Sequence, residues 1–213
     1  ALQRRGFENA VVMYNFKELE PLAESDIEYP KSEPYKLCTF SRVMKEKGIE
    51  DAINAVESVN AHFGRTVYTL DIFGQIDVEY KERFSQLEKS FPDYISYGGA
   101  IEANKSVETL KSYFALLFPT YYKGEGFAGT LIDAMSAGVP VIASDWKYNP
   151  EFVVPGKTGV IIKNCNAERL AEELINIAAA PEKWNSMRLS ALKESEKYKP
   201  DIAARPLIDR ING

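Results

Sequence analysis

Residues 123–144 read Lys123-Gly-Glu-Gly-Phe-Ala-Gly-Thr-Leu-Ile-Asp-Ala-Met-Ser-Ala-Gly-Val-Pro140-Val-Ile-Ala-Ser144. A glycine-rich loop opens a helix here, and the helix feeds a short apolar strand. Glycines let the backbone turn tightly and approach a ligand, because they carry no Cβ. The unpaired N–H groups of the first helical turn face the same space and favour an anion. The stretch therefore predicts a site for an anionic ligand.

Apolar runs and helical periodicities alternate along the rest of the chain. We predict strands at 10–14, 36–40, 67–73, 94–97, 115–118, 139–143 and 159–162. We predict a helix end at 2–6, a connecting loop at 15–34, and helices at 48–61, 78–89, 106–113, 167–179, 181–197 and 201–211. Alternating strands and helices form a parallel sheet with helices on both faces. The expected fold class is thus α/β, a Rossmann-like doubly wound parallel sheet with a helical C-terminus.

Composition excludes several classes of function. The chain has 31 acidic and 26 basic residues among 213, a net charge of -5, so we expect no nucleic-acid partner. Cys38 and Cys165 lie far apart without ligand-spaced neighbours, which indicates reduced thiols, a cytoplasmic location and no structural metal. The single histidine, His62, ends a predicted helix, which argues against serine–histidine hydrolysis. We find no transmembrane segment and no signal peptide pattern.

Three segments follow predicted strands and should meet at one edge of the sheet: Ser41-Arg42, Gly74, and residues 121–129. Arg42 and Lys47 would neutralise a diphosphate there, although each is also typical of a solvated surface. Glu125 and Asp133 could likewise be a surface acid and an acid that complements the helix dipole.

Together these residues resemble a known pattern. It comprises Thr39-Phe-Ser-Arg42 with Lys47-Gly48, Phe118-Pro-Thr120, Glu125-Gly-Phe-Ala-Gly129, Asp133 to Ser144, Asn149-Pro-Glu151 and Gly156-Lys-Thr-Gly159. In this order they are similar to the carboxyl-terminal, donor-binding domain of retaining GT-B glycosyltransferases, in particular family 4, also called group 1. The resemblance implies one half of a GT-B fold.

The resemblance also implies roles for individual residues. Arg42 and Lys47 would hold the donor diphosphate, Glu125 would lie by the transferred sugar, and Asp133 would bind the ribose hydroxyls. Backbone amides would serve the sugar and phosphates, and further residues would line the nucleotide pocket. The amides are those of Gly126, Phe127, Ala128, Gly129 and Thr130, and the pocket residues are Gly74, Gly98 and Ile101.

The sequence departs from the family at three places. Asp133 replaces the usual second glutamate, and Ser41 replaces the glycine before Arg42. Residues 146–149 stand where the family commonly has a glycine pair. These changes affect the prediction of which donor binds more than the prediction that a donor binds.

The implied reaction is transfer of a sugar from a nucleoside-diphosphate sugar to a glycan or lipid-linked acceptor, as in polysaccharide biosynthesis, with retention and no obligatory metal or other cofactor. Fixed cations and helix amides would stabilise the leaving diphosphate. Tyr121, Tyr122 and Trp146 surround the loop in sequence and could either pack or offer faces to a sugar.

The resemblance divides the chain into residues 1–34, an edge strand with the interdomain connection, and residues 35–213, the nucleotide-sugar-binding domain. A preceding acceptor domain would be the missing partner, and it could also provide peripheral contact with the inner face of the membrane. We expect the chain alone to be weakly active or inactive.

Two alternatives stay open. The first is a non-catalytic GT-B-like binding module. The second is another GT-B activity, epimerisation or phosphorolysis, for which no catalytic histidine or cofactor lysine stands out.

Overall fold

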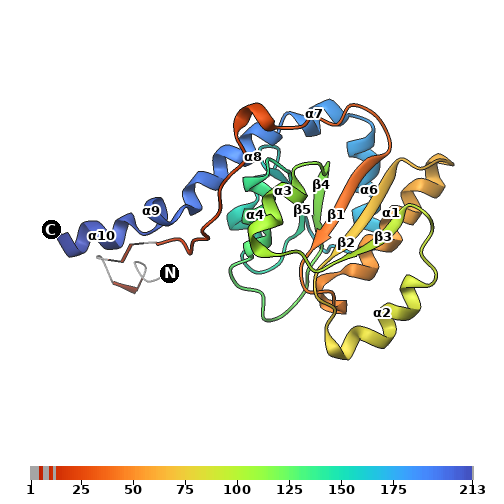
Figure 1. The fold of residues 1–213 in the computed structure, drawn as a ribbon, viewed down its shortest axis with the longest axis horizontal. Helices are drawn as coiled ribbons and strands as arrows, with labels where there is room; N and C mark the ends of the chain where they lie inside the picture. The colour runs from red at the N-terminus through yellow and green to blue at the C-terminus, as the bar shows by residue number, and fades with distance from the viewer. Residues whose placement is uncertain (1–4, 7–9, 12, 213) are drawn as a thin grey trace.

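The chain forms one sheet of six parallel strands, shown in Figure 1, in a computed structural model that describes residues 5–6, 10–11 and 13–212. The strand order is β3-β2-β1-β4-β5-β6. The strands are β1 (Tyr35–Phe40), β2 (Tyr68–Phe73), β3 (Ile95–Gly99), β4 (Ala115–Phe118), β5 (Val141–Ser144) and β6 (Gly159–Ile162). The order reverses between β1 and β4, which in open α/β sheets is where ligands bind. The predicted α/β class is confirmed.

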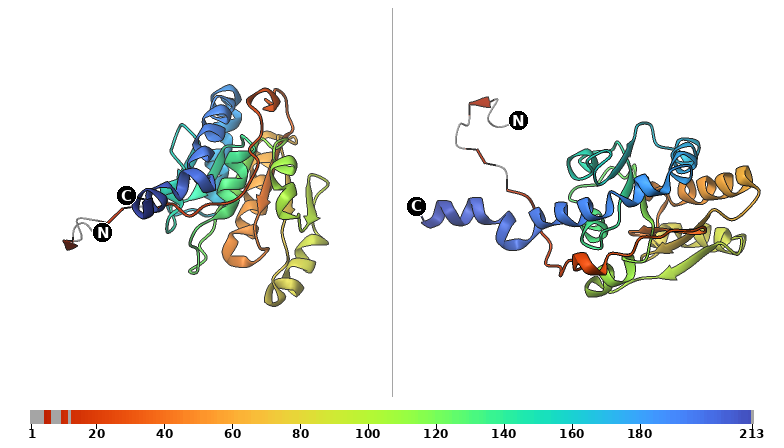
Figure 2. Two further views of the ribbon diagram at one scale, coloured as in Figure 1. Left: turned by 60° about the vertical axis from the view of Figure 1, so that its left-hand side comes forward. Right: turned by 90° about the horizontal axis from the view of Figure 1, so that it is seen from above.

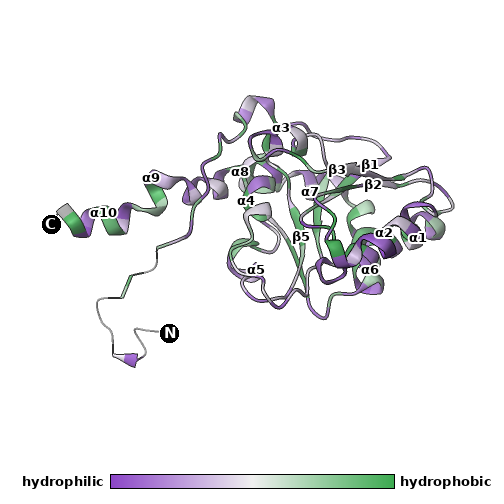
Figure 3. Cartoon of the chain, turned by 60° about the horizontal axis from the view of Figure 1, so that its bottom comes forward, coloured by the Kyte–Doolittle hydropathy of each residue, from purple (hydrophilic) through white to green (hydrophobic). Residues whose placement is uncertain are grey.

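Helices cover both faces of the sheet. One face carries α1 (Ile49–Phe63), α2 (Lys81–Glu88), α6 (Ala167–Ala178) and α7 (Pro181–Asn185). The other carries α3 (Ser106–Leu110), α4 (Gly129–Ser136), α5 (Asn149–Phe152) and α8 (Arg188–Ser195). Successive strand residues point to opposite cores, Leu37 to the first and Cys38 to the second. Figure 3 shows apolar strands between helices that turn polar faces outward.

The C-terminal part is helical, as predicted, but in shorter pieces. The predicted helix 181–197 is divided into α7 and α8, followed by the 3-10 turn η6 (Glu196–Tyr198). The predicted helix 201–211 is divided into α9 (Pro200–Ala203) and α10 (Arg205–Asn212). Pro181 and Pro200 stand in the first turn of their helices, where a missing N–H costs nothing. Figures 1 and 2 show α9 and α10 extending away from the sheet.

The predicted edge strand at 10–14 is wrong for the residues described there, since residues 10, 11, 13 and 14 have no regular structure. The Tyr14 ring packs edge-on against Tyr198, with centroids 5.7 Å apart, and the Lys17 amide donates to the Tyr198 carbonyl oxygen at 3.2 Å. The segment therefore runs beside η6 instead of joining the sheet. The helix end predicted at 2–6 falls mostly outside the described residues.

Other helix boundaries differ from the predicted ones by about one turn. Single 3-10 turns precede two helices, η4 (Val78–Tyr80) before α2 and η5 (Ala103–Lys105) before α3. Two more occur in loops, η2 (Glu24–Asp26) in the predicted connection and η3 (Lys45–Lys47) before α1. The short helix α5 has no apolar periodicity long enough to predict it.

Candidate functional site

The carboxyl ends of β1, β2 and β3 meet at one edge of the sheet, and the start of α4 is hydrogen-bonded to the end of β1. The Thr130 hydroxyl donates to the Phe40 carbonyl oxygen at 2.6 Å. The Gly74 amide, just past β2, donates to the Gly99 carbonyl oxygen at 2.8 Å. The structure thus brings the ends of β1, β2 and β3 together with the first turn of α4.

Gly74 is required by close packing of the backbone. Its φ is +137°, and a Cβ built on it would lie 1.7 Å from the Ser41 carbonyl oxygen. A side chain would strain the backbone at this φ, and its Cβ would clash with the Ser41 carbonyl oxygen. The chain can therefore bring the loops after β1 and β2 into contact only with glycine at this position.

A pocket of about 490 Å³ opens between these loops and α4. Five residues expected from the sequence line it: Gly74, Ile101, Gly129, Thr130 and Asp133. The remaining lining residues are Lys17, Phe40, Ser41, Gln75, Ala100 and Ala103. Glycine, serine and alanine make much of the wall, so ligand atoms can approach the backbone closely.

The acidic group of this pocket is Asp133, whose residue is 2% exposed. Its two oxygens accept hydrogen bonds from the Lys17 ammonium at 2.6 and 2.7 Å, and Oδ1 also accepts from the Ser106 hydroxyl at 2.9 Å. Burial raises the pKa of Asp133, and the hydrogen bonds from Lys17 and Ser106 oppose that rise. Sequence reasoning missed both partners, since no motif spacing links them to Asp133.

A second cluster lies at the end of β4. The Lys47 ammonium is 2.6 Å from Glu125 Oε2, and the Thr120 hydroxyl donates to the same oxygen at 2.9 Å. Aromatic rings of Phe118 and Tyr122 flank the ammonium, with centroids 5.4 and 5.3 Å away. The side chains of Lys47 and Glu125 are 12% and 8% exposed, so the alternative that they are solvated surface charges is wrong.

Arg42 and Gly98 are not brought to the pocket wall. The Arg42 side chain is 59% exposed, and its guanidinium lies 3.7 Å from an Asp77 carboxylate oxygen. Gly98 instead packs under Phe73, since an added Cβ would lie 2.1 Å from that ring. The Arg42 guanidinium therefore lies outside the pocket lining, beside Asp77.

The amides of the glycine loop differ in their availability. The Gly129 amide donates to the Phe127 carbonyl oxygen at 3.1 Å, so it is already engaged within the loop. Within the described part of the chain, four predicted amides have no acceptor, those of Gly126, Phe127, Ala128 and Thr130. The Phe127 ring packs against Phe152, with centroids 5.5 Å apart.

Trp146 holds this loop in place. Its indole Nε1 donates to the Tyr122 carbonyl oxygen at 2.7 Å, and the Glu125 amide donates to the same oxygen at 3.1 Å. The polar edge of Trp146 is thus used to fix the backbone next to Glu125. Tyr121 stays 38% exposed at the rim of the loop.

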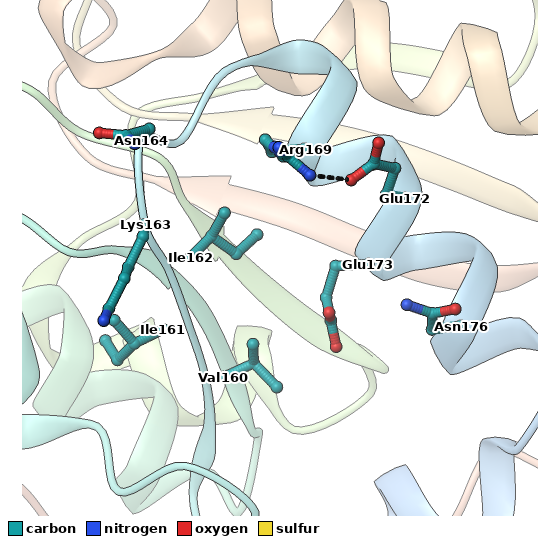
Figure 4. Close-up of a pocket in the computed structure, with 9 residues that line it drawn as sticks. All are labelled: Val160, Ile161, Ile162, Lys163, Asn164, Arg169, Glu172, Glu173 and Asn176. Carbon is teal, nitrogen blue, oxygen red and sulfur yellow. Dashed lines mark hydrogen bonds and ion pairs between the residues drawn. The ribbon is translucent and has the colours of Figure 1, made fainter.

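A separate hollow of about 340 Å³ lies between β6 and α6. Figure 4 shows Arg169 turned toward Glu172 on the same helix, and a guanidinium nitrogen of Arg169 donates to Glu172 Oε2 at 2.8 Å. None of the residues predicted for the site lines this hollow. It is therefore not the anion site that the glycine loop predicts.

Neither a metal-binding cluster nor a membrane-spanning helix occurs among the residues that the structure describes. No three histidine, cysteine or acidic side chains there are grouped so that they could hold a metal ion. No helix among them combines the length and apolar character needed to cross a bilayer.

Comparison with known proteins places these features in context. The family model described as "Glycosyl transferases group 1" matches residues 23–194. The GtfA subunit of the UDP-N-acetylglucosamine–peptide N-acetylglucosaminyltransferase of Streptococcus gordonii is 32% identical over 168 residues, covering 75% of this chain and 32% of that protein. The chain spans about a third of the length of the curated relatives that it matches first.

Solved structures show the same fold at lower identity. Anabaena Alr3699/HepE in complex with UDP superposes with a TM-score of 0.79 and 16% identity, over 96% of this chain and 58% of that one. The C-terminal domain of the glycosyl transferase group 1 family protein LpcC from Francisella tularensis gives a TM-score of 0.66 and 18% identity, over 84% of this chain and 99% of that one. The Rossmann-like half of a GT-B fold is thereby confirmed.

Proposed function

Because this chain belongs to the group 1 glycosyl transferases, we propose that it is the donor-binding half of a retaining, family 4 enzyme that transfers a sugar from a nucleoside-diphosphate sugar. The observation that carries the proposal is the placement of two shielded acids, one in the glycine loop and one on the helix that follows it. Asp133 lies in the pocket at the start of α4, and Glu125 lies beside Lys47 at the end of β4.

The two acids have different tasks in this proposal. The Asp133 carboxylate accepts hydrogen bonds from the ribose hydroxyls, a task for which its depth in the pocket is suited. Glu125 lies by the transferred sugar and supports the positive charge that develops as the bond to phosphate breaks. The pocket of about 490 Å³ is of the size that small-molecule sites have.

The leaving diphosphate needs compensation for its negative charge. We propose that Lys47 and the amides of Gly126, Phe127, Ala128 and Thr130 supply it, and that Arg42 moves inward from Asp77 when the donor binds. These groups give the leaving phosphate a preorganised positive environment from the chain itself, so no obligatory metal is proposed. The acceptor, a glycan or lipid-linked molecule, would be bound mainly by the domain that precedes this one.

Several relatives support this assignment in detail. The LpcC structure is of a C-terminal domain, which supports the same position for this chain. The S. gordonii relative is named for UDP-N-acetylglucosamine, and HepE was solved with UDP, so UDP is the first ligand to test. A Corynebacterium glutamicum relative is named for GDP-mannose, so GDP is the second.

Calorimetric titration with UDP, GDP and ADP, and with their sugar conjugates, tests the proposal. We expect one of the three bases to bind, and Glu125→Gln to change the affinity for the conjugate more than that for the free diphosphate. No binding of any nucleotide would refute donor binding.

A second candidate is the non-catalytic binding module. The observation in its favour is that both acids are already paired with lysines, Asp133 with Lys17 and Glu125 with Lys47. Joining this chain to its preceding domain separates the two functions. Nucleotide affinity without turnover on any acceptor would support the module.

A further inference from the structure

Lys17 enters the proposed donor pocket from a segment without regular structure. Its ammonium bridges both oxygens of Asp133, at 2.6 and 2.7 Å, and closes the carboxylate from the side that faces the pocket. The lysine side chain is 28% exposed, whereas that of Asp133 is 2% exposed. The outer partner of this pair is therefore the one that can leave.

The segment around Lys17 is attached by few contacts. The Lys17 amide donates to the Tyr198 carbonyl oxygen at 3.2 Å, and the Leu22 amide donates to the Ser136 carbonyl oxygen at 2.8 Å. Leu19 packs on the core beneath α4, but its neighbours on both sides are exposed. A segment with so little buried surface can shift without unfolding the domain.

The lysine also covers the start of α4. A Cβ built on Gly129 would lie 3.8 Å from Lys17 Cδ and 4.0 Å from its ammonium nitrogen. Any ligand that reaches both the first turn of α4 and Asp133 would therefore meet the Lys17 side chain. A ligand in this part of the pocket therefore requires the Lys17 side chain to move.

We propose that Lys17 is a gate on the donor pocket: it holds Asp133 in the free protein and must withdraw before the two ribose hydroxyls can take its place. This inference rests on the proposed function, because it takes Asp133 as the acceptor for the ribose. A diol that donates to both carboxylate oxygens needs the positions that the ammonium occupies. The gate lowers the affinity for donors and couples their binding to movement of residues 13–22.

Calorimetry on the whole chain tests the gate with two ligands, UDP and 2′,3′-dideoxy-UDP. We expect Lys17→Met to bind UDP about tenfold more tightly than the unmodified protein, since a charge-assisted contact no longer has to be broken. The dideoxy ligand should bind both proteins equally, because it has no diol. Lys17→Arg should behave as the unmodified protein, and Lys31→Met, which removes an exposed lysine of the same connection, should change neither affinity.

Amide hydrogen exchange gives a second readout that also reports folding. Lys17→Met should speed exchange of the Lys17 and Leu22 amides without nucleotide, and saturating UDP should do so in the unmodified protein. Exchange in the core strands should stay unchanged, which shows that the variant is folded.

Each other outcome is decisive. Equal UDP affinity in the unmodified protein and Lys17→Met would overturn the gate and leave the proposed function standing. Weaker binding by Lys17→Met would also overturn it, because Lys17 would then be a ligand of the donor. No UDP, GDP or ADP binding to any variant would refute the proposed function, and the gate with it.

Discussion

The Lys47 ammonium lies 2.6 Å from the Glu125 carboxylate, although 78 residues separate the two in sequence. Each comes from a different connection, Lys47 from the turn before α1 and Glu125 from the glycine loop before α4. The pair joins the two halves of the sheet at their point of reversal. It is largely shielded from water, which makes it sensitive to loss of one partner.

Lys47→Met should lower the free energy of unfolding by about 3 kcal/mol, because it leaves Glu125 buried with only the Thr120 hydroxyl as a side-chain partner. Urea unfolding of Lys47→Met, Glu125→Gln and the double variant measures this effect. The double variant should lose less than the sum of the single losses, since neither charge is then left unpaired. Additive losses would contradict the pairing.

Gly74→Ala should destabilise the chain far more than Gly64→Ala, and should abolish nucleotide binding. Both glycines have positive φ, but an added Cβ at Gly64 meets nothing within 4 Å, whereas at Gly74 it would clash with the Ser41 carbonyl oxygen. Gly64→Ala should therefore lower the free energy of unfolding by about 1 kcal/mol, from the strain of a side chain at positive φ alone. Thermal unfolding compares the two, and equal losses would contradict a role for close packing at Gly74.

Trp146→Phe should weaken UDP-glucose binding about fivefold, because the Tyr122 carbonyl loses the indole donor that fixes the loop next to Glu125. The matched control is Trp184→Phe, which removes an indole donor to the Phe114 carbonyl, buried among core side chains. That variant should lose stability but keep its affinity. It also leaves Trp146 as the only tryptophan of the sequence, so fluorescence quenching can report binding.

Neither cysteine should react with Ellman's reagent in the folded protein at pH 8. Burial raises the pKa of Cys165 to about 12 and raises that of fully buried Cys38 as well. The thiolate is the reactive form, so only a small fraction of Cys165 would be reactive at this pH. Two thiols should react after unfolding in guanidinium, and rapid labelling of either in the folded state would contradict the burial of the thiols.

Much of the fold could be predicted from local patterns. The apolar run Ala115–Phe118 is a strand buried on both faces, and the stripe on α1 is buried as its spacing indicates. Residues 10–14 have a similar apolar pattern but form no strand in their described part, because pairing needs a free sheet edge nearby. Local composition does not report where such an edge lies.

The sequence by itself determined the α/β class, the position of the glycine loop and the places of the two acids, Glu125 in the loop and Asp133 on the helix after it, because these depend on residue type and short-range spacing. Only the tertiary structure decided how the charges pair. Lys17 reaches Asp133 across 116 residues, and Arg42 turns to Asp77 instead of the pocket. Which cation neutralises a buried acid depends on the distances created by folding, and a carboxylate removed from water binds the cation that folding brings close to it.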